Sequence, residues 1–523
     1  MTRRLRGGHL AAAAGLVFLA TAPAHAQSDG QALLAETCGG CHAADASGAL
    51  SRISGQRKTP EGWLMTIVRM RLFHDAAIEP QVQSELVRYL SNTQGLAPSE
   101  TEGHRYILER APNHVEEVEA PLAEMCARCH SGARVSLQRR TPEEWNLLVN
   151  FHVGQWPTLE YQALSRDREW LKIAREEIVP YLAETYPLET EAWSSWLEAE
   201  MPEATGDWAF VTRLPEQGEA YGTLTVSGDD QPFEVSGTLM TADGTELPVS
   251  GRLNVYTGFE WRANLKIGGT DYREIAAISE DGGSLSGRLF LADEDSLGGA
   301  FSAVKAGGAP AIAGVVPSTL KAGSSSGSVQ IVGTGLEAVT LSGPIEASGG
   351  EQNAYGIAID LTPEAETNGA VTIAAGDATL SDDFAVYDHV DSVKIEPPYA
   401  VARVGGDGGT TPRVKARFEA IGYWNGPDGE PGTDDDVRIG ALPATWSVAP
   451  FDQIAEQMED VKYAGEIDAE LGIFTPGPAG LNPERPFSTN NAGDLKVLAD
   501  TGEATGEGHL IVTVQRWNDP PIR

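Results

Sequence analysis

The chain has 523 residues, of which 75 are Asp or Glu and 38 are Lys or Arg, giving a formal net charge of −37. At about 150 residues per domain, this length predicts several domains. The strong acidity excludes nucleic acid as an expected partner, because phosphate binding needs clustered Lys and Arg.

The first 26 residues are typical of a secretory signal peptide. A basic stretch over residues 2–6 precedes an apolar run over residues 10–20, and the small residues at 24–26 offer a cleavage site. The apolar run is too short to span a membrane, and no later run approaches a spanning length. We therefore expect residues 1–26 to be removed on export, leaving a periplasmic protein without a membrane span.

All four cysteines lie in two copies of the pentapeptide C-x-x-C-H, at residues 38–42 and 126–130. In this pattern two thiols bond to the vinyl groups of a porphyrin, and the adjacent histidine becomes an axial ligand of the iron. Four cysteines in an exported protein would otherwise suggest disulfides, and one C-x-x-C alone could be a redox pair. Two copies that use every cysteine predict two covalent c-type haems. The predicted attachment residues are Cys38, Cys41, Cys126 and Cys129, and the predicted proximal ligands are His42 and His130.

The two motifs head a duplicated unit within residues 27–200. Residues 57–63 read R-K-T-P-E-G-W, and residues 139–145 read R-R-T-P-E-E-W. Each T-P-E predicts a helix start, with Thr as N-cap, Pro at the first helical position and Glu in the first turn. The order helix, haem, helix, helix is that of a small cytochrome c, so we predict an all-α dihaem cytochrome c domain. The two repeats span about residues 27–98 and 115–190.

Helical periodicity predicts the second axial ligand of each iron. Positions i, i+4 and i+7 share one helical face, which carries Trp63, Ile67 and Met70 in the first repeat and Trp145, Val149 and His152 in the second. Met70 and His152 are thus equivalent, and we predict both as distal ligands. His74 lies on the same face as Met70 and remains an alternative to it, whereas Met65 lies off this face.

These ligands predict two chemically unlike haems. Methionine ligation raises the reduction potential and bis-histidine ligation lowers it, within a range of about 0.8 V accessible to axial ligands. Two unequal haems form a short directional path, which suits a partner whose two electrons must leave singly.

After about residue 200 the sequence changes to short alternating runs separated by turn dipeptides. This pattern predicts three all-β domains without a recognisable catalytic motif: a β-barrel or sandwich at 201–308, an immunoglobulin-like sandwich at 309–389 and a C-terminal β-sandwich at 390–523. The spaced carboxylates of residues 425–436 could bind calcium, although an acidic surface loop is the preferred interpretation.

The combination of these features resembles the large (alpha) subunit of quinohemoprotein amine dehydrogenase. The paired T-P-E-x-W repeats, the three following β domains and the segments 426–436 and 490–494 carry the resemblance over the whole mature chain. It implies an electron-transfer subunit of a periplasmic heterotrimer with a β-propeller subunit and a small subunit bearing cysteine tryptophylquinone. There a primary amine would become aldehyde and ammonia, and a soluble cytochrome or copper protein would accept the electrons.

The resemblance also assigns roles within this chain. It implies the same haem attachment residues and proximal histidines, with His152 and Met70 as distal ligands and His74 as the alternative to Met70. The partner's quinone requires a free cysteine bonded to tryptophan. Because all four cysteines here are committed to haem, this chain is not expected to contain that catalytic centre.

Two other functions are compatible with a dihaem chain. A dihaem peroxidase would need one iron with an open sixth position for peroxide, whereas Met70 and His152 predict two six-coordinate irons. A free-standing dihaem carrier would use its β domains to bind a membrane or cell-wall partner.

Overall fold

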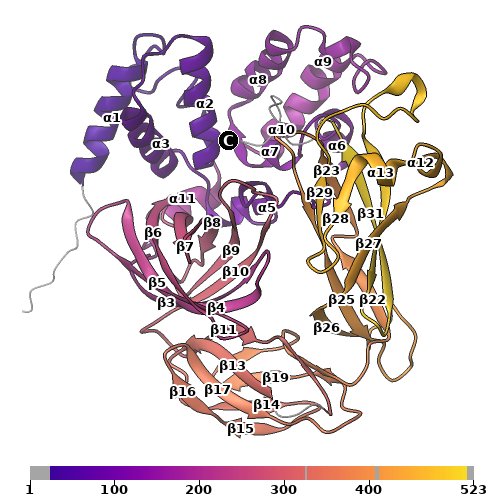
Figure 1. Cartoon of the computed structure of the whole chain (residues 1–523). Helices are drawn as coiled ribbons and strands as arrows, with labels where there is room; N and C mark the ends of the chain where they lie inside the picture. The colour runs from indigo at the N-terminus through magenta and orange to yellow at the C-terminus, as the bar shows by residue number, and fades with distance from the viewer. Residues whose placement is uncertain (1–23, 324–326, 407–411, 515–523) are drawn as a thin grey trace, which may run out of the picture.

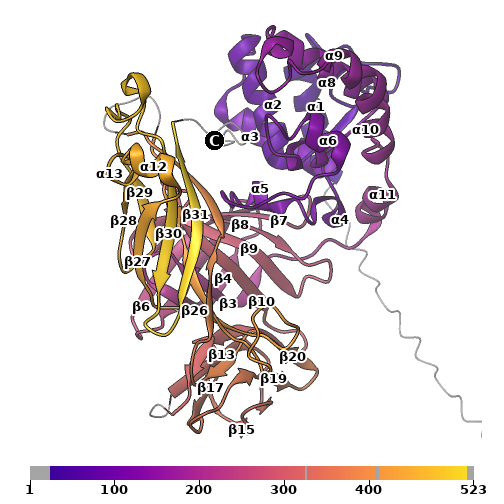
Figure 2. The same cartoon turned by 90° about the vertical axis from the view of Figure 1, so that its right-hand side faces the viewer.

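The computed structural model describes residues 24–323, 327–406 and 412–514. Four structural regions follow one another along the chain (Figure 1). A helical region lies over one end of a β-barrel, and a third, strand-rich region lies at the far side of that barrel. The C-terminal region stands beside the barrel and the helical region in both views (Figures 1 and 2). The predicted signal peptide lies almost entirely outside the described residues.

The N-terminal region contains two helical repeats. The long helices α2 and α8 begin at Pro60 and Pro142, as the T-P-E motifs predict, and Thr59 and Thr141 cap them by accepting a hydrogen bond from the third residue beyond. The helices of the first repeat and connector are α1 (Ala24–Cys38), α2 (Pro60–Phe73), α3 (Pro80–Thr93), α4 (Pro98–Thr101) and α5 (Arg105–Leu108). The later ones are α6 (Ala120–Met125), α7 (Ala133–Ser136), α8 (Pro142–Gln155), η1 (Leu159–Tyr161), α9 (Trp170–Ile173), η2 (Ala174–Ile178), α10 (Val179–Thr185) and α11 (Glu191–Glu198).

The prediction that this region is all-α is wrong in one respect, because a two-stranded antiparallel ribbon joins the repeats. Strand β1 (Gln56–Lys58) pairs with β2 (Gln138–Arg140), and Arg57 lies opposite Arg139. The two strands are equivalent segments of the repeats, so the ribbon relates the repeats by an approximate two-fold axis. Both arginines bind one buried carboxylate, Glu100, with N–O distances of 2.8 Å for Arg57 and 3.0 Å for Arg139.

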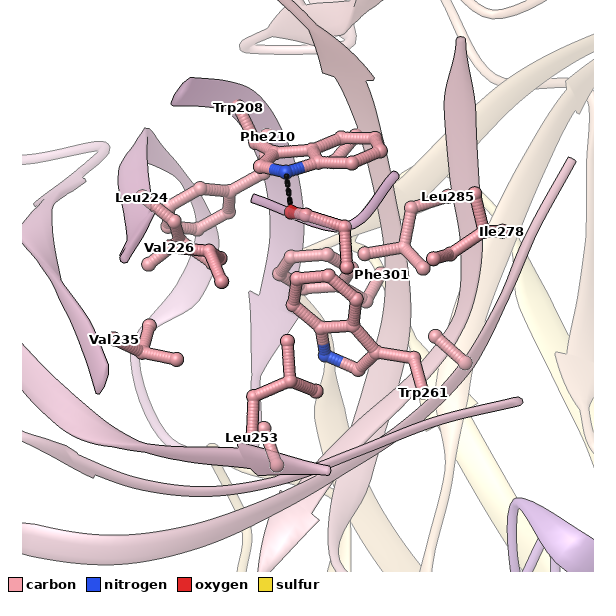
Figure 3. Close-up of a cluster of buried hydrophobic side chains, with 14 of the residues drawn as sticks. Trp208, Phe210, Leu224, Val226, Val235, Leu253, Trp261, Ile278, Leu285 and Phe301 are labelled. Atoms are coloured by element: carbon pink, nitrogen blue, oxygen red, sulfur yellow. Dashed lines mark hydrogen bonds between the residues drawn. The ribbon is translucent and has the colours of Figure 1, made fainter. Parts of the chain in front are cut away.

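The second region is a closed eight-stranded barrel in the order β10-β3-β4-β5-β6-β7-β8-β9, with every neighbouring pair antiparallel. Alternate side chains fill its interior, where the rings of Trp208 and Trp261 meet edge to face at 5.9 Å (Figure 3). The strands are β3 (Gly206–Leu214), β4 (Gly218–Ser227), β5 (Phe233–Thr241), β6 (Glu246–Tyr256), β7 (Glu260–Ile267), β8 (Thr270–Ile278), β9 (Ser284–Leu291) and β10 (Gly298–Lys305).

Buried contacts dock the helical region on the barrel. Trp196 of α11 packs into the barrel core against Phe259, and its Nε1 donates to the carbonyl of Thr257 at 2.8 Å. The barrel residue Arg262 bonds to Glu61 in the first turn of α2 at 2.6 Å. The barrel therefore supports α2, the helix that carries Met70.

The third region consists of three small sheets around one apolar core. Its first sheet has the order β11-β13-β17-β16, the second β12-β21-β18 and the third β15-β14-β19-β20. The strands are β11 (Ala311–Val316), β12 (Thr319–Lys321), β13 (Gly327–Thr334), β14 (Val339–Ser342), β15 (Ala347–Gly349), β16 (Glu351–Asn353), β17 (Gly356–Leu361), β18 (Gly369–Ala370), β19 (Thr372–Ala375), β20 (Ala378–Leu380) and β21 (Ala385–Tyr387).

The C-terminal region also has three sheets, in the orders β22-β25-β26, β23-β31-β30-β27 and β24-β29-β28. It is not purely β as predicted, because two five-residue helices, α12 (Gln453–Gln457) and α13 (Asp460–Ala464), pack beside it. Its other elements are β22 (Ser392–Glu396), β23 (Tyr399–Arg403), β24 (Ala416–Arg417), β25 (Glu419–Trp424), β26 (Val437–Leu442), β27 (Thr445–Pro450), β28 (Gly465–Ile467), β29 (Ile473–Pro476), η3 (Pro486–Ser488), β30 (Gly493–Asp500) and β31 (Thr505–Thr513).

Within the three described stretches, no helix combines the length and the apolar character needed to cross a membrane.

Candidate functional site

A cavity of about 1310 Å³ lies in the second repeat, with part of its lining supplied by the first repeat. Cys126, Cys129 and His130 of the second C-x-x-C-H line it, and so does His152 of α8. The cavity therefore brings together the four residues that the sequence predicts for the second iron site. Its volume exceeds that of pockets for drug-sized ligands, about 300–1,000 Å³, and leaves room for a group as large as a porphyrin.

The imidazoles of His130 and His152 are as far apart as two ligands of one metal ion would be. Their ring centroids are 6.4 Å apart. Two imidazoles bound to one metal ion from opposite sides need centroids roughly 6 Å apart, because each metal–nitrogen bond is about 2 Å long. The Nδ1 atom of His152 bonds to the carbonyl of Leu148 at 2.8 Å, and Nδ1 of His130 bonds to the carbonyl of Ser131 at 2.9 Å. These bonds orient both rings and leave Nε2 available for a metal.

Burial keeps these two imidazoles neutral, which is the form that binds a metal. It lowers the pKa of His130 to about 4, although the bond to Ser131 acts in the opposite direction. Burial also lowers the pKa of His152, and nearby Arg134, Arg69 and Arg140 add to that effect.

Helix α8 and the last helix of the repeat form the apolar walls of the cavity. Trp145, Val149 and His152 all line it, so the face predicted from the i, i+4, i+7 spacing is the one that faces the cavity. Trp170 and Ile178 line the cavity from the opposite helix, whose π-helical turn η2 ends two residues before Pro180. Proline lacks an amide proton, so it cannot make the regular helical hydrogen bond there.

In the first repeat, Cys38 packs with the core that contains Trp63 and Ile67 of α2. Met70 lies on the same face of α2 and is half-buried, whereas His74 follows the end of the helix and is exposed. The Nδ1 atom of His42 bonds to the carbonyl of Ser51 at 2.8 Å, which parallels the bonds of His130 and His152.

Within the described residues, none of the four cysteines forms a disulfide. Burial raises the pKa of Cys126 to about 12, with a smaller effect of Cys129, and it also raises the pKa of Cys38. The thiols of Cys126 and Cys38 therefore lie in an apolar environment of the kind that a porphyrin edge would occupy.

The cavity described above, which contains the second predicted iron site, is called the second cavity. The sequence did not predict the cations that line it. Helix α2 of the first repeat contributes Met65, Thr66 and Arg69 to the lining, so one helix carries residues of both candidate sites. Met65, which lies off the face of Met70, faces this second cavity. The available signal was the basic pair before each T-P-E in an otherwise acidic chain. The lining cations are Lys58, Arg69, Arg128, Arg134 and Arg140.

The acidic loop at residues 425–436 uses its carboxylates to bind its own backbone. Asp436 accepts from the amide of Gly432 at 2.7 Å, and Asp428 accepts from the amide of Glu430 at 2.8 Å. Across the described residues, no group of three or more His, Cys, Asp or Glu side chains is arranged to hold a metal ion. The loop geometry gives the calcium interpretation no support.

Three family models match this chain, and together they cover most of it. Residues 28–193 match the quinohemoprotein amine dehydrogenase A, alpha subunit, haem-binding model. Residues 202–306 match domain II of the quinohemoprotein amine dehydrogenase alpha subunit, and residues 393–522 match domain IV. The haem-binding match includes both C-x-x-C-H motifs.

No curated protein sequence matches the chain. Among solved structures, it is similar to a redesigned beta barrel, mFAP1, bound to DFHBI, with 14% identity, a TM-score of 0.17 and coverage of 19% of this chain and 93% of that chain. It is also similar to Sidekick-1 immunoglobulin domains 1-4, with 9% identity, a TM-score of 0.14 and coverage of 61% of this chain and 97% of that chain. Scores this low bear on neither fold nor function.

Proposed function

The chain belongs to the family of quinohemoprotein amine dehydrogenase alpha subunits, and from that premise we propose that it carries two covalent c-type haems and relays electrons out of an amine-oxidising complex. Family membership makes it a haem-binding subunit of an oxidoreductase that has other subunits, and implies electron transfer. We further propose the number of haems, their covalent attachment, the partner subunits and the direction of electron transfer.

The pair His130 and His152 carries the proposal. Two neutral imidazoles at 6.4 Å, in a cavity also lined by Cys126 and Cys129, fit the donor set of a covalently attached, bis-histidine haem. Haem iron bound there would supply a one-electron couple. The protein's part is to orient both rings through backbone carbonyls and to keep the site apolar.

For the first haem we propose attachment at Cys38 and Cys41, with His42 and Met70 as axial ligands. Met70 is preferred over His74 because it is half-buried on the face of α2 that packs toward Cys38, while His74 is exposed beyond the helix end. A thioether ligand would give this haem the higher intrinsic potential of the two.

The proposed partners are a β-propeller subunit and a small subunit with cysteine tryptophylquinone. There a primary amine and water would give an aldehyde, ammonia, two protons and two electrons, with the quinone as the two-electron acceptor. The two haems would pass these electrons singly to a soluble cytochrome or copper protein. Export through the signal peptide at residues 1–26 would place this chemistry in the periplasm.

Two alternatives make different predictions. A dihaem peroxidase needs an iron with an open sixth position, which the spacing of His130 and His152 disfavours for the second site. A free-standing carrier would purify alone and would not be reduced by amines.

The test is to purify the native complex with its partner subunits and to add a primary amine without oxygen. We expect the haem bands to become reduced, and bands that stay oxidised would contradict the amine dehydrogenase role. Covalent attachment is tested separately, by counting haems that remain on the denatured chain. Wild type should hold two, and Cys126→Ala with Cys129→Ala should hold one, as should the matched pair Cys38→Ala with Cys41→Ala.

A further inference from the structure

The lining of the second cavity has a charge opposite to that of the protein. Five of its side chains are Lys or Arg, and among the described residues that line it none is Asp or Glu, although acidic residues outnumber basic ones 75 to 38 in the chain. Arg128 pairs with Asp167 at 2.9 Å. The remaining four form the cationic cluster, defined as Lys58, Arg69, Arg134 and Arg140.

Two members of this cluster, Lys58 and Arg69, have neutral partners. The Nζ atom of Lys58 donates to Oγ1 of Thr66 at 2.8 Å, and the guanidinium of Arg69 lies over the ring of Phe151 at 5.2 Å. In the part of the chain that the structure describes, neither cation forms an ion pair with a carboxylate. Arg140 approaches Glu144 only at 3.8 Å, and that carboxylate also binds Arg52 at 2.9 Å.

Burial makes this concentration of like charge unfavourable. Lys58 and Arg140 are 6% and 5% exposed. Burial, followed by repulsion from Arg140 and Arg69, holds the pKa of Lys58 well below its ordinary value. Burial likewise lowers the pKa of Arg140 to about 10, against the attraction of Glu144. Buried cations are stable in proteins when an anion compensates them, so the cavity is built for an anionic occupant.

The rest of the lining defines the shape of that occupant. Leucine, isoleucine, valine and tryptophan side chains form most of the walls, which a small inorganic anion could not use. The fitting ligand is a large apolar group with carboxylates at one edge. Haem has this chemistry, because its porphyrin is apolar and carries two propionates.

We propose that Lys58, Arg69, Arg134 and Arg140 bind the propionate carboxylates of the haem in the second cavity, an inference that rests on the proposed function. Lys58 and Arg69 belong to the first repeat, so both repeats hold this haem. The cations act as positioning and potential-setting residues. Positive charge near the iron favours the reduced state, which offsets the lowering of the potential by bis-histidine ligation.

The test is a redox titration of the full-length holoprotein, with the bis-histidine haem identified by its paramagnetic resonance signature. Arg69→Met should shift the electron distribution between the two haems at least tenfold, which is about 59 mV for a one-electron couple, by lowering the potential of the bis-histidine haem. Lys58→Met should act in the same direction, and Arg69→Lys should restore most of the wild-type potential.

Arg71→Met is the matched control, because Arg71 is on the same helix, bonds to Gln83 at 2.8 Å and does not line the cavity. Potentials that do not move in Arg69→Met, or that move equally in Arg71→Met, would overturn the propionate assignment. If Lys58→Met does not accumulate, Arg69→Met decides alone, since Arg69 is only partly buried. A chain with no covalent haem would instead refute the proposed function, so the two failures are distinguishable.

Discussion

Replacing Glu100 by Gln should loosen the junction between the two repeats. The carboxylate of Glu100 binds Arg57 through both oxygens, at 2.8 and 3.0 Å, and binds Nε of Arg139 at 3.0 Å. Both arginines belong to the ribbon that joins the repeats, and all three side chains are buried. The substitution keeps the shape of the side chain but leaves two buried guanidinium groups facing each other without their counter-charge.

The magnitude follows from these contacts. Removing one partner of a buried ion pair costs about 3–5 kcal/mol. The Gln carbonyl can still accept one hydrogen bond, which returns about 1 kcal/mol. The expected loss in the free energy of unfolding is therefore roughly 2–4 kcal/mol.

The same group predicts an acid-sensitive junction. Burial acts to raise the pKa of Glu100, but the hydrogen bond and charge of Arg57 and the charge of Arg139 outweigh it and lower the pKa below its ordinary 4.5. The stabilisation by a carboxylate with a depressed pKa is complete above that ordinary value and is lost as the pH falls through the folded value. Wild type should lose it below about pH 4.5, and Glu100→Gln should not show this loss.

Urea unfolding of the holoprotein, followed by haem absorption, measures both effects. The exposed neighbour Glu102 provides the control, because Glu102→Gln changes the same charge without breaking a buried contact. The denaturant slope should be unchanged, so that the midpoint reports stability. A Glu100→Gln variant within about 0.5 kcal/mol of wild type, the usual range of surface substitutions, would refute the reasoning.

Three further predictions concern other parts of the chain. Burial raises the pKa of Glu274 in the barrel interior to about 8, so the free energy of unfolding should fall between pH 4.5 and 8 by roughly 5 kcal/mol and then level off, and Glu274→Gln should remove this decline in urea titrations. Met70→Ala should abolish the weak sulfur-to-iron charge-transfer band of the oxidised holoprotein, whereas His74→Ala should retain it. Trp196→Ala should cost the barrel about 3–5 kcal/mol in thermal unfolding monitored by near-ultraviolet circular dichroism, because the indole packs in the barrel core.

Each of these predictions has an outcome that contradicts it. A wild-type stability profile that is flat between pH 5 and 8 would show that the Glu274 carboxyl is not protonated in the folded barrel. A wild-type holoprotein without the sulfur-to-iron band, combined with a changed low-spin spectrum in His74→Ala, would move the distal ligand to His74. An unchanged thermal transition in Trp196→Ala would show that α11 does not stabilise the barrel.

Local signals in the sequence account for the parts that could be predicted. The starts of α2 and α8 depend on a Thr cap followed by Pro and Glu, which act within one turn. The face of α8 toward the cavity follows from helical periodicity alone, because the cavity lies on its apolar side. The change to β structure after about residue 200 follows from alternating strands and turn dipeptides, whereas the choice of a closed barrel over a sandwich and the order of the strands do not.

The features that escaped prediction depend on contacts between distant segments. Strands β1 and β2 are three charged or polar residues each, and they become strands only because the repeats pair across an approximate two-fold axis. Arg69 precedes Arg134 by 65 positions, and nothing near either residue indicates that both line one cavity. The helices α12 and α13 are five residues long, which is too short for a periodic signal.

Helix α2 lies between the two proposed haem sites and carries residues of both. One face carries Trp63 and Ile67 into the core of the first repeat and has Met70 at its next position, and the adjacent face carries Met65 and Arg69, which line the second cavity. A helix with its side chains is about 10–12 Å across, so the two proposed haems would lie roughly one helix apart. Under the proposed ligation, methionine raises the potential of one haem and bis-histidine lowers that of the other, which alone would trap the electron on the first. Arg69, the cation that α2 presents to the second cavity, would act against this difference. The same helix would therefore separate the two haems and bring their potentials together, as a relay that passes single electrons requires.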